Sequence, residues 1–496
     1  MRKLGRKVIA SLAGGWARRR VNRLQPGHPE NTLRALLSQA RNTRYGREHR
    51  FGGILESPSL YEAYREQVPI IDYTDWVEWL GPAGPNQEQG PTPLIDQAWP
   101  GRIDIFCLSS GTTTGRTKYI PYSPAMAAIN RKAAFDFFAT YLAQKPELAP
   151  LLSRTLYLSG STKLSRSETG VIAGDMSGLT KYMAPKILDP LVLPSREVSA
   201  LEPWETRLEA LIDVCLENQD IGVISGIPIW QLTLVEAVAA AAKKPLQEAM
   251  PNLRYLVHGG MSIAPYREHL QALMGGGVQL LEVYAASEAG IAAFQLPGEE
   301  GMRFWQGYDV FFEFEDEDGH VCLADGVKTD QSYRLLISSC SGLWRYRIGD
   351  CLVFLQNDPL ILSHVSRDKT TSAFDEKVTE LELERAMLAM PSPVADFSLG
   401  PDIEKRRHVW FLVSDEGVSG EWLSLLDRHL RDGNQDYDDY RGDGRINPPH
   451  AVPIRDRGAY LKLLGREEGG QRKFPRLLSP AETAKALGEF DRTHTG

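Results

Sequence analysis

Three threonines lie between two glycines in the segment SSGTTTGRTKYIP, residues 109–121. Backbone amides of a glycine-rich loop can turn inward together and bind an anion, and the hydroxyls of serine and threonine add donors. Lys118 adds a mobile positive charge. The loop follows an apolar stretch and precedes a helical pattern that begins near Ser123, as phosphate-binding loops do. It is not a Walker A loop, because three residues rather than four separate Gly111 from Gly115. Two interpretations stand, a phosphate cradle and an ordinary surface loop.

A second polar segment, YAASEAG at residues 284–290, also follows an apolar strand pattern. Tyr284 could stack on a base. Glu288 could hold a magnesium ion that bridges phosphate oxygens, because a carboxylate suits that hard cation. The alternative is a buried tyrosine followed by a glutamate at the start of a helix, where the helix dipole favours negative charge.

A third segment, GLWRYRIGD at residues 342–350, ends in an acidic residue at an expected strand end. Asp350 could accept hydrogen bonds from ribose hydroxyls, as acidic residues do in other nucleotide sites. Arg345 and Arg347 are expected to share one face of the strand. The alternative is an ordinary Gly-Asp turn.

A fourth segment, SRDKTTSAFDEKVTELELE at residues 366–384, lies where the pattern of elements changes. Arg367 and Asp368 could serve there as a hinge between two domains. The alternative is a charged linker.

These segments must be positioned by the elements around them. Apolar runs that end in glycine alternate with helical patterns through the first two thirds of the chain, which predicts an α/β fold with a substantially parallel sheet. Two hairpins follow, in DVFFEFEDEDGH and in YRLLISSCSGLWRYRIGDCLVFL. The last quarter has the pattern helix, strand, helix, which predicts a smaller α+β domain. We therefore expect a large domain with mixed or parallel sheets and a β-hairpin subdomain at residues 1–363, and a small mobile domain at residues 364–496.

Composition narrows the class of protein. The 496 residues are 42% hydrophobic and 24% charged, which is ordinary for a globular chain. The net charge of -8 argues against a nucleic-acid-binding protein. Five scattered cysteines without a C-x-x-C pair indicate a reduced, cytoplasmic protein. No stretch is long and apolar enough to span a bilayer. The basic start, MRKLGRKVIASLAGGWARRR, predicts an amphipathic surface helix rather than a signal peptide, and a weak contact with a membrane surface stays open.

Taken together, the four segments resemble the adenylate-forming superfamily and, more closely, the auxin-responsive Gretchen Hagen family of acyl-acid amido synthetases, including its bacterial members. The family's loop S-S-G-T-x-x-G-x-x-K is matched at every fixed position from Ser109 to Lys118. Its second motif is matched by Tyr284, Ser287 and Glu288, and GLWRYRIGD nearly reproduces the third. Further matches, such as VPIIDYTDW, LVHGGMSIAPYR and GGQRKFPRLLS, extend the resemblance over nearly the whole chain.

The resemblance implies a two-step reaction. A carboxylate oxygen attacks the α-phosphorus of ATP and pyrophosphate leaves; an amine, usually of an amino acid, then attacks the acyl carbon and AMP leaves. Lys118 would neutralise the phosphates, Glu288 would hold Mg²⁺, Tyr284 would border the adenine, and Asp350 would bind the ribose. Lys473 would reach the α-phosphate or acyl oxygen, although an exposed lysine in a basic turn is the alternative. The further residues expected to bind the nucleotide are Ser109, Ser110, Gly111, Thr112, Thr113, Thr114, Gly115, Ser287 and Arg347.

The resemblance also places the pocket for the acid between the long helix after the loop and strand ends near residues 224–230 and 258–262. Trp230, His258 and Met261 are candidates for its lining. No segment identifies the acid or the amine.

Other functions are compatible with parts of the pattern. An acyl- or aryl-CoA ligase shares the adenylation step but uses a thiol acceptor, and the chain has no strongly basic patch for the phosphates of coenzyme A. A non-catalytic nucleotide-binding scaffold would bind ATP without turnover. A phosphotransferase would release ADP rather than AMP and pyrophosphate.

Overall fold

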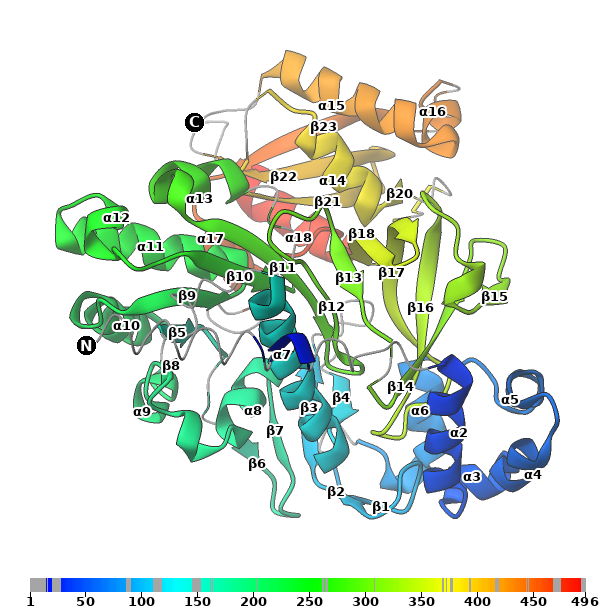
Figure 1. The fold of residues 1–496 in the computed structure, drawn as a ribbon. Coiled ribbons are helices and arrows are strands. Elements are labelled where there is room, and N and C mark those ends of the chain that lie inside the picture. The colour runs from blue at the N-terminus through cyan, green and yellow to red at the C-terminus, as the bar shows by residue number, and fades with distance from the viewer. Residues whose placement is uncertain are drawn as a thin grey trace, which may run out of the picture. The chain divides into compact units, whose positions relative to one another are not determined.

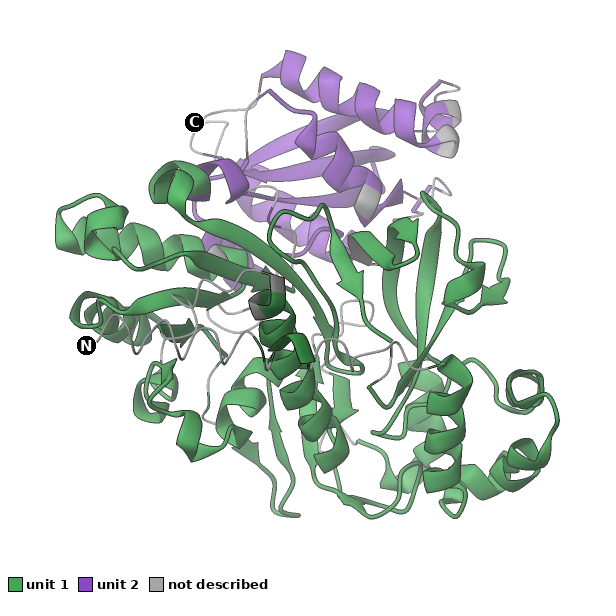
Figure 2. Cartoon of the chain, viewed as in Figure 1, with its two compact units in different colours: residues 1–111, 117–260, 271–365 green, residues 112–116, 261–270, 366–496 purple. Residues whose placement is uncertain are grey.

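The structure is a computed structural model. The chain folds into two compact units (Figure 2). Unit 1 comprises residues 1–111, 117–260 and 271–365, and unit 2 comprises residues 112–116, 261–270 and 366–496. The described residues are 15, 17–19, 28–85, 91–109, 118–144, 153–160, 162, 164–202, 204–260, 263, 266–306, 308–367, 370–371, 373–374, 378–391, 394–414, 419–442, 444, 446–466 and 474–491. Most of the basic N-terminal segment lies outside them.

Short helices open unit 1 (Figure 1). They are α2 (Pro29–Ala40), α3 (Arg44–Glu48), α4 (Phe51–Glu56), α5 (Leu60–Gln67), α6 (Tyr73–Leu80) and the 3₁₀ turn η1 (Gly81–Ala83). In α2 the buried residues Leu33, Leu36, Leu37 and Ala40 recur at helical spacing and form its core-facing stripe. Helix α2 ends at Ala40. A new helix, α3, then begins at Arg44, where Thr43 caps its N-terminus by accepting a hydrogen bond from the Gly46 amide.

A four-stranded sheet of described strands follows, in the order β4-β3-β7-β6. Its strands are β3 (Ile105–Ser109), β4 (Lys118–Pro121), β6 (Ser165–Arg166) and β7 (Ile172–Gly174). Strands β3 and β4 are antiparallel partners. The pair β1 (Leu94–Ile95) and β2 (Arg102–Ile103) lies before them in the chain.

The largest sheet among the described residues has twelve strands, in the order β15-β14-β16-β17-β18-β13-β12-β11-β10-β9-β5-β8. Strands β8, β5, β9, β10 and β11 run parallel, and antiparallel pairing begins at β12. The strands are β5 (Arg154–Tyr157), β8 (Val192–Leu193), β9 (Ile221–Gly226), β10 (Tyr255–Gly259), β11 (Gln279–Ala286), β12 (Gly290–Phe294), β13 (Met302–Phe304), β14 (Val310–Glu315), β15 (Val321–Cys322), β16 (Ser332–Ser339), β17 (Tyr346–Asn357) and β18 (Leu360–Arg367).

Helices connect the parallel strands, as crossovers between parallel strands require. Helix α11 packs on β9 and β10, and α7 packs on β12. The helices are α7 (Pro124–Gln144), α8 (Met176–Met183), α9 (Arg196–Ser199), α10 (Trp204–Glu217), α11 (Pro228–Ala242), α12 (Leu246–Ala249) and α13 (Arg267–Met274), with the 3₁₀ turns η2 (Lys186–Leu188), η4 (Gly275–Gly277) and η5 (Ala324–Gly326). No described helix is long and apolar enough to cross a membrane.

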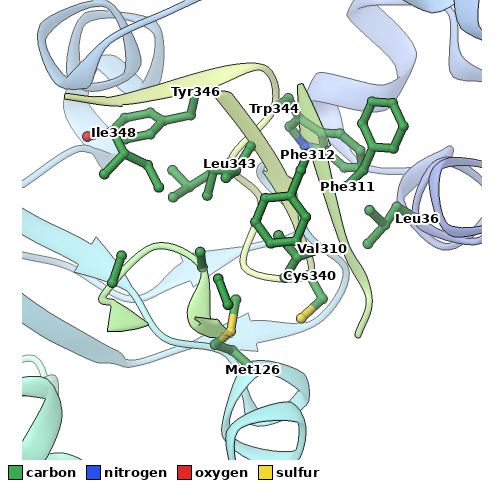
Figure 3. Close-up of a cluster of buried hydrophobic side chains, with 14 of the residues drawn as sticks. Leu36, Met126, Val310, Phe311, Phe312, Cys340, Leu343, Trp344, Tyr346 and Ile348 are labelled. Carbon is green, nitrogen blue, oxygen red and sulfur yellow. The ribbon is translucent and has the colours of Figure 1, made fainter. Parts of the chain in front are cut away.

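The main core of unit 1 joins the N-terminal helices to the antiparallel half of the large sheet. Trp344 is its central aromatic side chain, fully buried, with Phe51 packed edge-on at 4.7 Å between ring centroids. The indole nitrogen of Trp344 donates a hydrogen bond to the Ala98 carbonyl at 3.0 Å. Leu36 of α2 and Phe311 of β14 lie in the same cluster (Figure 3).

Unit 2 is an α+β structure. Its three-stranded sheet has β22 in the centre, antiparallel to β21 and parallel to β23. Along β22, Val409 and Phe411 belong to one core cluster, and Trp410 and Leu412 belong to the other. This alternation lets one strand bury both of its faces. The elements are β19 (Thr370–Thr371), β20 (Val378–Thr379), α14 (Glu380–Leu388), β21 (Asp396–Asp402), β22 (Arg407–Val413), α15 (Gly420–Gly433), α16 (Gln435–Gly442), β23 (Asn447–Ile454), α17 (Arg457–Leu463) and α18 (Pro480–Phe490).

The predicted fold class is confirmed: a large α/β part with mixed sheets and hairpins is followed by a smaller α+β part. The predicted hairpins correspond to β14–β15 and β16–β17. The helix predicted to begin near Ser123 is α7, which begins at Pro124. The sequence analysis did not predict strand β4, which lies between the loop and α7.

Candidate active site

The hydroxyl-rich loop connects two paired strands. Ser109 ends β3 and Lys118 begins β4, and the two residues are partners across the antiparallel pair. Residues 110–117 lie outside the described part of the chain, and so do the predicted phosphate ligands Ser110, Gly111, Thr112, Thr113, Thr114 and Gly115. Strand β4 directly follows the loop, so the N-terminus of α7 does not directly follow it as in a strand–loop–helix phosphate site.

Lys118 lies over an aromatic ring that comes from the N-terminal helices. Its Nζ is 5.5 Å from the centroid of the Tyr73 ring, within the range of a cation–π contact. The hydroxyl of Tyr73 accepts a hydrogen bond from the Tyr119 amide at 2.9 Å. Tyr73 is the first residue of α6, whose start is fixed by a capping box between Asp72 and Asp75. The sequence analysis did not select Tyr73, because no local pattern connects it to a lysine 45 positions later.

Glu288 lies in the turn between β11 and β12 and is buried, with 5% of its surface exposed. The alternative interpretation as a helix start is therefore wrong, since β12 begins at Gly290 and pairs with β11. Burial raises the pKa of the Cys107 thiol on β3, and the nearby Glu288 carboxylate raises it further. Glu288 thus lies close to the strand that leads into the hydroxyl-rich loop.

Asn130 of α7 holds this turn in place. Its Oδ1 accepts a hydrogen bond from the Ile291 amide at 3.1 Å, and its Nδ2 donates to the Tyr122 hydroxyl at 2.8 Å. Gly290 has a φ of +70°, and a Cβ there would lie 2.2 Å from Asn130 Oδ1. The glycine of the YAASEAG segment therefore permits both the left-handed backbone and the close approach of the helix. The sequence analysis did not select Asn130, because no motif in its helix distinguishes it from other polar residues.

The second and third segments meet through one hydrogen bond. The hydroxyl of Tyr284 on β11 donates to Oδ2 of Asp350 on β17 at 2.9 Å, and both side chains are buried. Asp350 lies inside β17, so the prediction of a strand end and the alternative of a Gly-Asp turn are both wrong. The pairing of β17 with β16 is interrupted by a bulge in β17 between Arg347 and Cys351. Gly349, inside the bulge, has a φ of +88°. Such a bulge re-aims the adjoining side chain, here that of Asp350.

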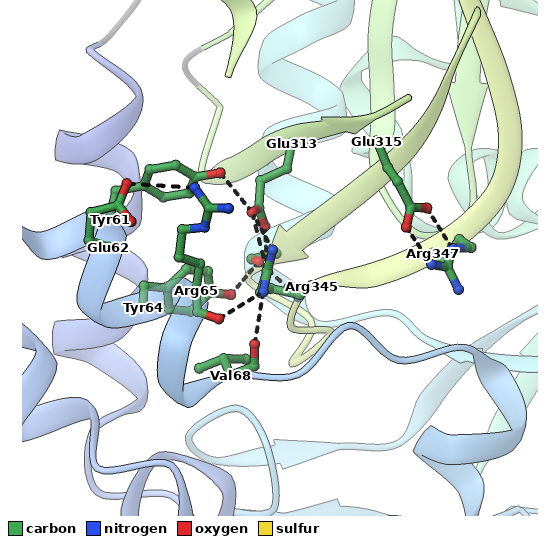
Figure 4. Close-up of polar contacts among 10 residues, drawn as sticks. Tyr61, Glu62, Tyr64, Arg65, Val68, Glu313, Glu315, Arg345 and Arg347 are labelled. Atoms are coloured by element: carbon green, nitrogen blue, oxygen red, sulfur yellow. Dashed lines mark hydrogen bonds and ion pairs between the residues drawn. The ribbon is translucent and has the colours of Figure 1, made fainter. Parts of the chain in front are cut away.

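The two arginines of the third segment have separate acidic partners (Figure 4). Arg345 precedes β17 with a φ of +43° and does not share a strand face with Arg347, contrary to the prediction. Arg347, predicted to bind the nucleotide, pairs with Glu315 at 2.8 Å, and the nucleotide contact stays a prediction.

Arg345 is a buried junction between the N-terminal helices and the large sheet. It pairs with fully buried Glu313 at 3.0 Å and donates hydrogen bonds to the carbonyls of Arg65 and Val68, each at 3.1 Å (Figure 4). Burial raises the pKa of the Glu313 carboxyl, and Arg345 opposes that shift. The next stretch of backbone, at Ile71, bridges to Tyr346. These contacts of Arg345 and Ile71 therefore hold the segment that leads to Tyr73 next to the start of β17, the strand that contains Asp350.

The remaining predicted residues are spread over other places. Trp230 stacks on Trp204 with ring centroids 5.1 Å apart, and His258 is buried in β10. Ser287 lies in the turn beside Glu288. Arg367 is the last residue of β18. The predicted residues outside the described part of the chain are Met261, Asp368 and Lys473.

An apolar cavity lies between the second half of α7 and strands β9, β10 and β11. The hydroxyls of Tyr141 and Tyr255 form a hydrogen bond at its border. Its lining residues are Phe137, Phe138, Tyr141, Val223, Tyr255, Val257 and Leu281. The cavity borders the long helix expected to flank the acid pocket, but its lining includes neither Trp230 nor His258, and the position of the acid pocket stays a prediction.

Solved structures define the class of fold. An acyl acid amido synthetase, GH3.15, matches with a TM-score of 0.70 and 17% identity over 93% of each chain. A 2-hydroxyisobutyryl-CoA ligase in the postadenylation state matches with a TM-score of 0.58 and 13% identity, over 92% of this chain and 90% of that one. The protein thus has the fold of the adenylate-forming ligases.

Sequence comparison then identifies the family. The model of the GH3 family N-terminal domain matches residues 25–225, and that of the GH3 family central domain matches residues 306–364. The chain belongs to the GH3 family, as its motifs predicted. The jasmonoyl–L-amino acid synthetase of Nicotiana attenuata is 22% identical over 91% of each chain. An indole-3-acetic acid-amido synthetase of Arabidopsis thaliana is 28% identical over 40% of this chain and 34% of that protein.

Proposed function

We propose that this protein is an ATP-dependent acyl-acid amido synthetase. It joins a carboxylic acid to ATP, releases pyrophosphate, and transfers the acyl group from AMP to the nitrogen of an amino acid. The observation that carries the proposal is the hydrogen bond between Tyr284 of β11 and Asp350 of β17, with Glu288 in the turn that follows β11 and Lys118 at the start of β4 in the same unit. Membership of a family whose relatives are acid–amino acid synthetases supports the reaction type.

Each residue has a role that its surroundings suit. Tyr284 donates a hydrogen bond to one carboxylate oxygen of Asp350, so the aspartate is held in one orientation for the ribose hydroxyls that we propose it binds. Lys118 compensates the charge of the phosphates, and residues 109–115 contribute backbone amides and hydroxyls. Ser287 and Arg347 complete the proposed nucleotide site, and Lys473 is proposed to act on the α-phosphate or the acyl oxygen.

Glu288 is proposed as the ligand of Mg²⁺. It is a single buried carboxylate, and Mg²⁺ is commonly bound by one or two carboxylates together with the substrate's phosphates. When bound, the ion would neutralise charge on the phosphate oxygens. Asn130 holds the turn that carries the carboxylate, and this fixes Glu288 independently of the ion.

The acyl group is proposed to bind beside the second half of α7, where the small apolar cavity, of about 20 Å³, would have to widen to admit it. Four aromatic side chains of its lining, Phe137, Phe138, Tyr141 and Tyr255, favour an apolar acid, and the described lining contains no charged group. We place the reaction in the cytoplasm, because all five cysteines are free thiols and the reaction consumes ATP.

The proposal is tested by ATP–pyrophosphate exchange with a panel of carboxylic acids. We expect exchange with apolar acids and its loss, about 100-fold or more, in Lys118→Ala, because one positioned charge in a phosphate site commonly contributes on that scale. The matched control is Lys132→Ala, whose Nζ lies 5.0 Å from the Tyr308 ring centroid in a similar cation–π contact on α7. Equal loss in both variants would refute the assigned role of Lys118.

A second experiment identifies the molecule that accepts the acyl group. The fold similarity to a CoA ligase keeps a thiol acceptor as the second candidate. Amino acids or coenzyme A are added to the enzyme with acid and ATP, and the products are separated by mass spectrometry. Amide formation supports the proposal. A thioester as the sole product contradicts it.

A further inference from the structure

The hydroxyl of Tyr346 is buried without a hydrogen-bond partner among the residues that the structure describes. The residue has no exposed surface, so bulk water does not supply the missing partner. Leaving a buried hydroxyl unpaired costs about 1–3 kcal/mol, and unpaired groups of this kind in native structures call for an explanation. In Figure 3 the hydroxyl points away from Phe311 and Trp344 of the apolar core.

The backbone of Tyr346 is held on both sides. It pairs with Ile337 of β16 on one edge and bridges to Ile71 on the other. The preceding residue is Arg345, the buried junction described above. The side chain is therefore fixed in a rigid part of the sheet, and its unpaired hydroxyl does not result from a loose loop.

The surroundings of the hydroxyl are those of the proposed nucleotide site. Tyr346 and Asp350 both belong to β17, and both side chains are buried. Burial raises the pKa of Tyr346 well above its ordinary value, and the carboxylate of Glu288 and the side chain of Tyr73 raise it further. The phenol therefore lies in the neighbourhood of the proposed Mg²⁺ ligand and of Tyr73, and the backbone of Tyr346 bridges to Ile71, two residues before Tyr73. A phenol that stays protonated at neutral pH is a hydrogen-bond donor and needs an acceptor.

We propose that the Tyr346 hydroxyl donates a hydrogen bond to an oxygen of the β- or γ-phosphate of ATP, and that Tyr346 is thus a further ligand-binding residue of this site. The inference rests on the proposed function. The proposed function supplies an acceptor near Lys118 and Glu288, because the terminal phosphates are the part of ATP assigned to Lys118. The donor is neutral, so it adds directional recognition without adding charge.

The experiment measures equilibrium binding of ATP, AMP and inorganic pyrophosphate by calorimetry, without acid or amine, to the wild type and to Tyr346→Phe. Losing a hydrogen bond to a charged group lowers affinity by about 10-fold or more. We expect this loss for ATP and pyrophosphate, and a change within about twofold for AMP, which lacks the terminal phosphates. We also expect an unchanged or higher Tm, because the variant removes an unpaired buried hydroxyl.

Tyr45→Phe is the matched control. Its hydroxyl is also buried without a partner among the described residues, but its ring packs against Trp79 and His49 in the helical N-terminal part. We expect its nucleotide binding to equal that of the wild type.

The outcomes separate cleanly. Equal affinity of wild type and Tyr346→Phe for ATP would overturn the inference and leave a buried water as the partner. Equal weakening for ATP and AMP, or a lowered Tm, would also overturn it, because both point to a general structural role. Failure of the wild type itself to bind ATP would instead refute the proposed function.

Discussion

At the scale of single residues, the site depends on buried polar groups that the protein keeps paired and oriented. Asp350 is held by Tyr284, and the turn of Glu288 is held by Asn130. A carboxylate oriented before the ligand arrives loses less entropy on binding. Tyr346 is also held before the ligand arrives, because its backbone pairs with Ile337 on one side and bridges to Ile71 on the other.

A buried lysine outside this site gives a prediction about pH. Lys181 of α8 is buried and donates a hydrogen bond to the Val192 carbonyl at 2.9 Å, and burial lowers its pKa to about 8. The unfolded chain therefore binds more protons than the folded one between about pH 8 and the ordinary lysine pKa of 10.5. The contribution of this group to the free energy of unfolding must rise with pH across that window.

We expect Lys181→Met to remove this rise. The measurement is urea unfolding of wild type and variant from pH 7 to pH 10, compared as the difference between the two. Lys186→Met, an exposed lysine in η2, is the control and should follow the wild type. A difference that does not change with pH would show that Lys181 keeps its ordinary pKa.

At the scale of elements, the buried pair Arg345–Glu313 joins α5 to strands β14 and β17. Removing one partner of a buried pair leaves the other charge uncompensated, which costs about 3–5 kcal/mol. We expect Arg345→Met and Glu313→Leu each to lower the free energy of unfolding on that scale. The double variant should lose less free energy of unfolding than the two single variants together, because neither charge remains buried without its partner.

Urea unfolding at pH 7 measures all three variants. Arg102→Met, which breaks an exposed pair with Asp104, is the control and should cost about 1 kcal/mol or less. Additive losses in the double variant would show that Arg345 and Glu313 act independently.

At the scale of the whole molecule, the two units are each built around their own core. We predict that the small domain, residues 364–496, changes orientation between adenylation and amide formation, with a hinge at Arg367 and Asp368. Closing a domain over a labile intermediate excludes water from it. Proline restricts φ, so Asp368→Pro should retain acid-dependent pyrophosphate exchange and lose amide formation about 10-fold or more.

Asp368→Ala, which keeps the backbone free, should retain both activities. Exchange and product formation are measured on the same preparation. Parallel loss of both activities in Asp368→Pro would contradict a hinge that separates the two steps.

Local patterns in the sequence determined the order of helices and strands, the fold class and the segments that carry the site. Periodicity and glycine position are local properties, so they can be recognised one segment at a time. The family resemblance added the reaction, because three short motifs kept their order and spacing.

Only the tertiary structure decided which residues meet. Strand β4 takes its place after the loop through pairing with β3, and Asp350 lies inside a bulged strand, neither of which a local pattern specifies. Tyr284 and Asp350 are 66 positions apart, and Asn130 reaches a turn 161 positions away. Contacts at such separations depend on how the strands and the helices that cover them pack together, and this packing is set by burial summed over the whole chain.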